Sequence, residues 1–337
     1  MSTKILTEHR LPAASLGSAR TLTVIRYGDN PAIRKAYIQA GLHADEAPAF
    51  VLMHHLINLL DRADAAGMIA GQIILVPVAN PIGLGQWRDE VLQGRFDFYD
   101  SINFNRRYPD LTDAVADRIK DRLYDSPAEN VALIRKAAAA VLATATPQDE
   151  TGHLKHLLLS LSLDADIVLD LHCDDQAVMH VYLGTPLWPD AADLSARLGA
   201  EATLLAEDSG VMPFDEACSR IWWQLAERFP EHPIPPACLS ATVELRGKAD
   251  VSHEFASQDA EHIFWFLQGR GFIRGAVPAP PRLRNEATPL RGVAHIKAEV
   301  PGIVVFLKQP GDRVAKGETI AELLNPLSND RDNGNHL

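Results

Sequence analysis

Two histidines and one glutamate have the residue types and local settings of a catalytic metal site. His43 and Glu46 lie three residues apart in the segment GLHADEAP, between a strand-like and a helix-like pattern. His172 directly follows the apolar run DIVLDL. Histidine and glutamate are ordinary zinc ligands, and two histidines with one glutamate leave a coordination position open for catalysis. Alternatively, the first motif is a capping turn and His172 a buried imidazole satisfied by Asp170, which could equally orient a ligand.

A fourth residue, Glu244, has the setting of a general base. It lies inside the β-branched run TVELRG. Burying an unpaired carboxylate is costly, so a glutamate in such a strand suggests a functional reason. If it faces a metal-activated water, it can accept the proton. On an edge strand it is merely an outward-facing charge.

The loop NFNRRYP carries amides and guanidiniums in succession. Asn105 and Arg106 match the geometry with which a carboxylate is bound. Arg95 precedes them in the same connection, and Arg88 lies farther back; either could reach the site. The alternative is a solvated basic loop.

The elements that must position these residues follow from the hydrophobic pattern. Strands are expected over residues 21–28, 35–40, 73–79, 166–171 and 241–245, and helices over 47–66, 150–163, 215–229 and within 111–145. The order strand, helix, strand over 35–79 predicts a βαβ unit and a mostly parallel sheet. Because ligands bind beyond the carboxyl ends of parallel strands, the histidines lie where a site is expected.

Taken in order, the motifs resemble the succinylglutamate desuccinylase/aspartoacylase family of the zinc carboxypeptidase superfamily. That family has H-x-x-E, then N-P, N-R-x-F/Y-P, D-L-H and a glutamate in a T-x-E-x-G-like strand. This chain has HADE at 43–46, NP at 80–81, NRRYP at 105–109, DLH at 170–172 and TVELRG at 242–247. The resemblance implies an α/β fold with a mixed, mostly parallel sheet flanked by helices, and a small C-terminal all-β module.

The resemblance also implies residue roles. His43, Glu46 and His172 would bind one Zn²⁺ per chain, and Glu244 would be the catalytic base. The water activated by zinc would attack the amide, and the glutamate would carry its proton to the leaving amine.

On the substrate side, the resemblance assigns Asn105 and Arg106 to a substrate carboxylate and Arg95 to the oxyanion. Departures from the family pattern concern the pocket and leave the ligands in place; they fall at Ala44, Asp45, Asp110 and Arg246.

Composition narrows the function class. The chain has 337 residues, 47% of them hydrophobic, and a net charge of −12. An acidic chain is unsuited to binding nucleic acid or an anionic membrane. Residues 157–171 are too short and too charged to cross a bilayer, and residues 1–20 lack the core of a signal peptide. Three cysteines favour a cytoplasmic location over a disulfide framework.

Domain boundaries follow from the proline-rich stretch 276–290, which is typical of an extended linker. We expect a zinc hydrolase domain over 1–280, a small β module over 288–326 and a disordered tail over 327–337. The module has no Met-Lys pair for a carrier role. It is expected to shield the mouth of the zinc site or to form the interface of a homo-oligomer.

The sequence thus predicts a zinc-dependent deacylase that hydrolyses a small N-acyl amino acid, or a related amide with a carboxylate. Two alternatives stay open. One is a zinc carboxypeptidase acting on peptides, which uses the same metal and base in a more open cleft. The other is a metal-binding or ligand-binding protein without turnover.

Overall fold

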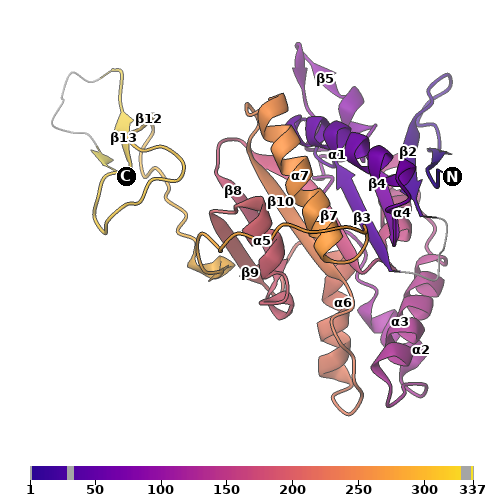
Figure 1. The fold of residues 1–337 in the computed structure, drawn as a ribbon. Coiled ribbons are helices and arrows are strands. Elements are labelled where there is room, and N and C mark those ends of the chain that lie inside the picture. Colours follow the sequence, from indigo (N-terminus) through magenta and orange to yellow (C-terminus); the bar gives the residue numbers. More distant parts are fainter. Residues whose placement is uncertain (1, 29–33, 328–334, 337) are drawn as a thin grey trace.

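A nine-stranded mixed sheet forms the centre of the protein (Figure 1). The computed structural model describes residues 2–28, 34–327 and 335–336. The sheet order is β1-β2-β4-β3-β7-β10-β8-β9-β11. Its strands are β1 (Ile5–Arg10), β2 (Thr21–Tyr27), β3 (Lys35–Ala40), β4 (Gln72–Val76), β7 (Ile167–Asp174), β8 (Met179–Gly184), β9 (Ala202–Ala206), β10 (Leu239–Gly247) and β11 (Thr288–Pro289).

Parallel pairing dominates the middle of this sheet. The pairs β4–β3, β3–β7 and β7–β10 are parallel, as are β8–β9 and β9–β11. The pairs β1–β2, β2–β4 and β10–β8 are antiparallel. The mixed, mostly parallel sheet expected from the sequence is confirmed.

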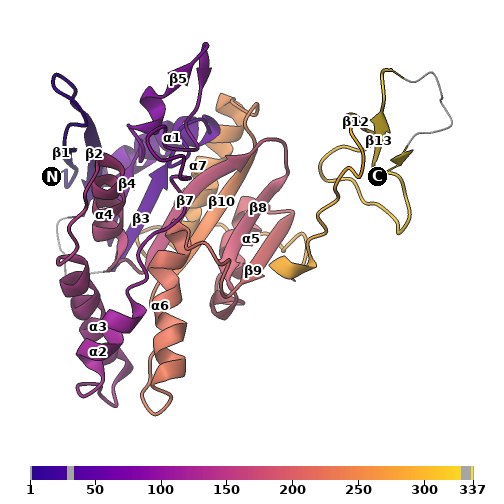
Figure 2. The ribbon, with the colours of Figure 1, turned by 180° about the vertical axis from the view of Figure 1, so that it is seen from behind.

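Helices cover both faces of the sheet (Figures 1 and 2). One face packs on α1 (Pro48–Ala65), α5 (Ala192–Leu198) and α7 (His253–Gly269). The other packs on α2 (Thr112–Ile119), α3 (Pro127–Leu142), α4 (Glu150–Ser162) and α6 (Phe214–Arg228). Alternate residues of β3 serve the two layers: Ile38 belongs to the first core and Tyr37 to the second. A strand buried on both faces is mostly apolar, so buried polar residues within these central strands, such as Gln39 on β3 and Asp170 on β7, are exceptions.

The helical region expected within 111–145 divides into α2 and α3. The break comes before Pro127, which disfavours helical geometry in the residue preceding it. Ser126 then caps the new helix, its side chain accepting a hydrogen bond from the backbone N–H of Glu129. Proline at the first helical position is favourable, so the sequence itself explains the restart.

Smaller elements surround the sheet. β5 (Trp87–Arg88) and β6 (Val91–Leu92) form a hairpin, and short 3₁₀ turns span Gly83–Gly85, Thr185–Leu187 and Leu290–Gly292. The C-terminal β module contains β12 (Ile303–Phe306) and β13 (Ala321–Leu324), which pair antiparallel. Within the expected tail, β14 (Asn335–His336) pairs with β13, and residues 328–334 and 337 lie outside the described residues.

No helix in the described residues has the length and apolar character needed to span a membrane. Cys173, Cys218 and Cys238 are buried and unpaired.

Candidate metal centre

The first two residues of the site are held in a turn directly after β3. Gly41 starts this turn at a φ of +72°, and a Cβ there would lie 2.2 Å from the ring of Phe50. Only glycine fits, because it tolerates positive φ and has no side chain. Asn80 fixes the turn from the side by donating to the backbone oxygen of Leu42 at 2.9 Å. The turn therefore presents His43 at the carboxyl end of β3, as the sequence predicts.

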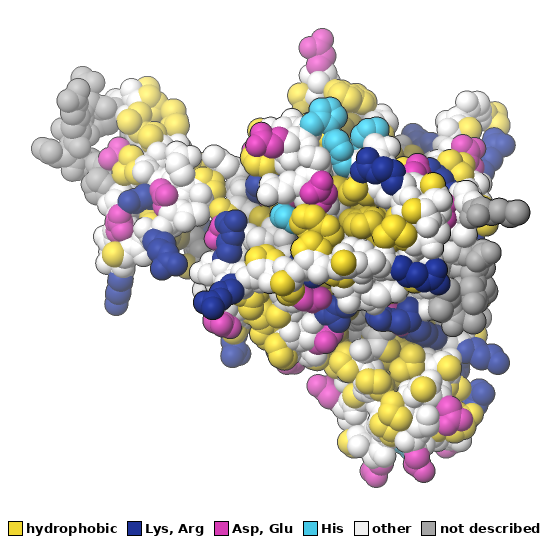
Figure 3. Space-filling view, viewed as in Figure 1, with side chains coloured by type: hydrophobic (Ala, Val, Ile, Leu, Met, Phe, Trp, Pro, Cys, Tyr) yellow, Lys and Arg dark blue, Asp and Glu magenta, His cyan; other side chains and the backbone are white. Residues whose placement is uncertain are grey.

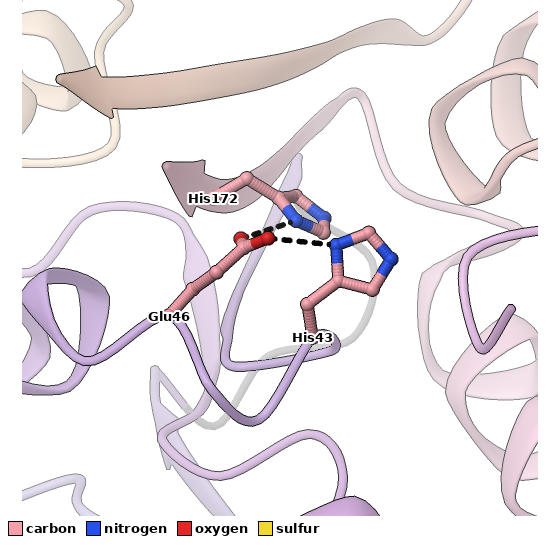
Figure 4. A group of neighbouring side chains, drawn as sticks. All are labelled: His43, Glu46 and His172. Atoms are coloured by element: carbon pink, nitrogen blue, oxygen red, sulfur yellow. Dashed lines mark hydrogen bonds and ion pairs between the residues drawn. The ribbon is translucent and has the colours of Figure 1, made fainter. Parts of the chain in front are cut away.

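His43, Glu46 and His172 converge on one point, although they come from two separate segments (Figure 4). One ligand atom from each lies within 4.8 Å of the others. The Nδ1 atoms of His43 and His172 lie 2.9 Å from Oε1 and Oε2 of Glu46, respectively. All three side chains are at most 3% exposed. The structure thus brings together the three residues predicted to bind metal.

The donors and acceptors around this group call for a cation. The Nε2 atom of His43 lies 2.8 Å from the amide oxygen of Asn103, and Nε2 of His172 lies 2.8 Å from Oδ2 of Asp170. Each imidazole therefore has an oxygen atom within 2.9 Å of each ring nitrogen, but a neutral imidazole carries only one N–H. When that N–H points to the outer oxygen, the inner nitrogen faces the Glu46 carboxylate with a lone pair. A divalent cation between them satisfies both, so the donor set fits a metal.

The charges in the group respond to one another. Burial alone would raise the pKa of Glu46, but His172 and His43 outweigh it and hold that pKa well below its usual range. Burial would lower the pKa of His172, yet the carboxylates of Asp170 and Glu46 raise it well above its usual range. The carboxylates of Asp170 and Glu46 on either side of His172 therefore favour a positive charge between them.

Glu244 lies beside the ligand group on the next strand. In the parallel ladder it is the direct register partner of His172. Burial raises the pKa of the Glu244 carboxyl to about 7, with His172 acting in the opposite direction. Its Oε2 atom is buried without a hydrogen-bond partner in the described part of the chain. A buried carboxyl group that titrates near neutrality is suited to proton transfer.

Arg95 reaches the ligand group and Arg88 does not. Arg95 donates to Oε1 of Glu46 at 2.9 Å, with 39% of its side chain exposed. Arg88 is an exposed residue of β5, and its guanidinium lies over the ring of Phe98 at 5.3 Å. Of the two arginines that the sequence left open, the structure therefore places Arg95 at the site.

Asn105 and Arg106 lie at the site, but their side chains differ in availability. Asn105 is 4% exposed; its amide oxygen accepts from the backbone N–H of Phe214 at 2.8 Å, and its Nδ2 lies 3.3 Å from Nε2 of His172. Arg106 borders a cavity of about 750 Å³ together with Asn103, Arg107 and Arg220. Asn105 is therefore a buried residue that holds neighbouring groups in position, whereas Arg106 lines the cavity.

Two contacts at the site were missed by the motif analysis. Asn103 lies beside the outer nitrogen of His43, as described above; the sequence analysis included it in the loop NFNRRYP but assigned it no role. Lys248 donates to Asp45 at 2.8 Å, which ties the metal-binding turn to the end of β10. No local pattern marks Lys248, because its partner is about two hundred residues away in the chain.

Comparison with known proteins bears on this geometry directly. The family model for the succinylglutamate desuccinylase/aspartoacylase catalytic domain matches residues 32–270. The chain belongs to this family. The match contains the metal-binding turn, the Asn105–Arg106 loop, His172 and Glu244. Both activities in the family name remove an acyl group, so the protein is a member of a deacylase family. No curated protein gave a match to the sequence.

Solved structures extend the likeness over the whole chain. A candidate family member from Shewanella frigidimarina NCIMB 400 is 25% identical with a TM-score of 0.87, covering 100% of this chain and 90% of its own. One from Shewanella amazonensis SB2B is 26% identical with a TM-score of 0.85, covering 99% and 91%. A Rhodobacter sphaeroides succinylglutamate desuccinylase/aspartoacylase shares the fold at 17% identity and a TM-score of 0.64, covering 96% and 84%.

Proposed function

We propose that the protein is a zinc-dependent deacylase that hydrolyses a small N-acyl amino acid or a related amide. The observation that carries the proposal is the convergence of His43, Glu46 and His172 beside Glu244. Family membership supports the same reaction class. Neither a structural metal site nor a binding protein requires a carboxyl group with a near-neutral pKa next to the ligands.

Zinc held by His43, Glu46 and His172 would supply a Lewis acid that polarises the scissile carbonyl and acidifies water. The ligand residues hold that charge in place because both outer nitrogens are fixed by neighbours. Asn103 orients His43 and Asp170 orients His172. Such outer partners set the ring orientation and strengthen the ligand.

Glu244 takes the proton of the attacking water and later delivers it to the leaving amine. Its Oε2 atom, which has no hydrogen-bond partner among the described residues, is available for this exchange. Burial raises the pKa of this carboxyl group in the metal-free site, which favours its taking up a proton. Arg95, which pairs with Glu46 and is 39% exposed, would stabilise the oxyanion with its guanidinium.

The substrate carboxylate binds to Arg106 in the cavity described above. Burial lowers the pKa of Arg106, and the positive charge of Arg95 lowers it further. A substrate carboxylate bound next to Arg106 would offset the repulsion between the two guanidiniums. Arg107 and Arg220 also line the cavity, but Asp100 and Asp208 do as well, and Arg220 already pairs with Asp208 at 3.0 Å, so Arg106 and Arg107 are the two arginines offered to an anionic substrate. The cavity thus supports an acyl amino acid with at least one free carboxylate.

Substitution of the base tests the mechanism. Glu244→Gln should retain about one zinc per chain and lose at least about a hundredfold in turnover, the scale of general base catalysis. Glu227→Gln, an exposed glutamate on α6, is the matched control and should keep normal turnover. Full activity of Glu244→Gln would reject the assigned base.

A substrate screen separates the alternatives. The zinc-loaded protein should hydrolyse one class among N-acetyl, N-succinyl and N-formyl amino acids. Hydrolysis of short peptides alone would identify a carboxypeptidase. Zinc binding without turnover of any amide would identify a binding protein.

A further inference from the structure

The C-terminal β module, residues 288–326, is the part of the chain with the most exposed apolar surface. Ten of the 24 large hydrophobic side chains exposed in the described residues belong to it. They include Ile296, Ile303, Phe306 and Val314, which are 52–70% exposed, with Phe306 the highest. Within the module only Ala321 and Leu323 are buried. Exposed apolar surface this concentrated marks an interaction site.

The module cannot bury this surface by itself. All four residues of β12, Ile303–Phe306, are exposed, although a continuous apolar run is typical of a strand covered on both faces. β12 and β13 have four residues each and β14 has two. A sheet this small is marginal in water without a covering layer. The module therefore requires a surface supplied from elsewhere.

The body of the same chain covers little of that surface: β11 pairs with β9 and Gly311 lies next to Val178, but all four residues of β12 stay exposed. Figures 1 and 2 both show the module standing apart from the body, connected by the extended segment that follows α7. The chain leaves the body through β11, which pairs with β9 at the sheet edge opposite β1. The apolar face of β12 is thus presented outward at one end of the molecule.

A groove on the body has matching character. It has a volume of about 710 Å³ and its apolar lining includes Ile82, Trp87, Phe98 and Tyr99. Trp87 is 61% and Tyr99 85% exposed. We call it the hairpin groove, because Trp87 belongs to the β5–β6 hairpin. In both ribbon views this hairpin lies well away from the module.

Charge favours contact between these two surfaces. The module carries five basic and four acidic side chains, whereas the whole chain has a net charge of −12. The hairpin groove is lined by the acidic Asp97, Asp149 and Glu150, and by one arginine, Arg20, which is already paired with Glu150. A slightly basic apolar module and an acidic apolar groove can therefore meet without the repulsion that two acidic bodies would suffer.

We propose that the C-terminal β module of one chain docks in the hairpin groove of a second copy of the chain. The groove and the module lie at different ends of the molecule, so two copies can exchange modules reciprocally. Two such contacts related by a two-fold axis close a dimer. This inference does not depend on the proposed reaction.

Sedimentation analysis of the full-length protein tests the dimer. The wild type should have twice the 36.9 kDa mass of the chain. Phe306→Asp in the module and Tyr99→Asp in the groove should each weaken the dimer at least about thirtyfold, the effect of losing an interface hot spot. Tyr124→Asp, which changes an exposed tyrosine between α2 and α3, is the matched control and should stay dimeric.

Mixing experiments identify the two surfaces. Val304→Cys and Tyr99→Cys proteins, combined under oxidising conditions, should form a disulfide-linked pair that neither variant forms alone. The natural cysteines are buried and do not compete. A monomeric wild type overturns the proposal, as does a dimer that survives Phe306→Asp. A dimer lost in Phe306→Asp but kept in Tyr99→Asp overturns the groove assignment. Circular dichroism on each variant distinguishes dissociation from unfolding.

Discussion

Two glutamates of the candidate site, Glu46 and Glu244, differ in how many partners their carboxyl oxygens have. On the metal side, each oxygen of Glu46 has two partners: His43 and Arg95 at Oε1, and His172 and the backbone N–H of Cys173 at Oε2. On the base side, Glu244 is buried with an oxygen that has no partner in the described residues. The carboxylate of the metal-binding group is thus fixed by several partners, whereas the carboxyl group proposed as the base has an oxygen that the described residues leave free for proton exchange.

This difference has an energetic consequence. A fully partnered buried network stabilises its geometry, whereas an unpartnered buried carboxyl group is unfavourable. The base is tolerated because neighbouring strands fix its backbone on both sides, through pairing with His172 on β7 and His180 on β8. On the proposed mechanism, stability is lost at the residue that transfers the proton.

Removal of a metal ligand should have the largest effect. His172→Ala leaves Glu46 and Asp170 facing each other without the imidazole, and metal affinity should fall by more than about a hundredfold, beyond the range of outer-partner substitutions. Metal content measured after dialysis should drop with turnover. His55→Ala on α1, outside the ligand group, should keep the metal. Retained zinc in the His172 variant would contradict the ligand assignment.

Neutralising the base should stabilise the metal-free protein. The pKa of Glu244 is raised from 4.5 to about 7, so the folded state keeps a proton that the unfolded state releases between these values. Stability therefore falls as pH rises from 4.5 to 7. Glu244→Gln removes this loss and should raise the free energy of unfolding by about 3 kcal/mol at pH 8.

Urea unfolding of chelator-treated wild type and variant at several pH values measures this gain. The gain should vanish near pH 4, where both states of the wild type hold the proton. Glu227→Gln should show no such pH dependence, because that side chain is exposed. An equal gain at pH 4 and pH 8 would show that the buried charge is not the cause.

Weakening the contact between Asp170 and His172 should lower zinc affinity less than removing His172 does. Asp170→Asn keeps the shape of the side chain but removes the charge beside Nε2 of His172, and zinc affinity should fall about 10- to 100-fold. Competition with a chromophoric chelator measures this change. Asp164→Asn, at the exposed approach to β7, should leave affinity unchanged.

The smallest effect concerns the backbone next to the base. Arg246 adopts a φ of +67° in the irregular segment between Glu244 and Gly247, and its guanidinium pairs with buried Asp259. Both alanine and glycine at this position lose the ion pair with Asp259. Alanine keeps the backbone strain of the positive φ, whereas glycine relieves it. Arg246→Ala should thus be less stable than Arg246→Gly by about 1–2 kcal/mol. Thermal unfolding compares the two, and equal melting temperatures would exclude strain at this position.

Local patterns predicted much of the fold and the ligand set. The helix expected over 47–66 is α1, and the strands expected over 35–40 and 166–171 are β3 and β7. These predictions succeed because apolar periodicity and positional signals such as Pro48 act within a few residues. The contact between Lys248 and Asp45 could not be predicted, because nothing near either residue signals its partner.

The sequence alone determined which residue types stand at the ends of the central strands, because burial on both faces forces apolar runs and polar residues then mark where the strands end. Only the tertiary structure decided that His172 meets Glu46 and that Glu244 stands beside them. The sheet order β3–β7–β10 sets these distances, because it places strands that are far apart in the chain side by side. The pKa of Glu244 likewise depends on burial, a property of the whole fold that no local motif contains.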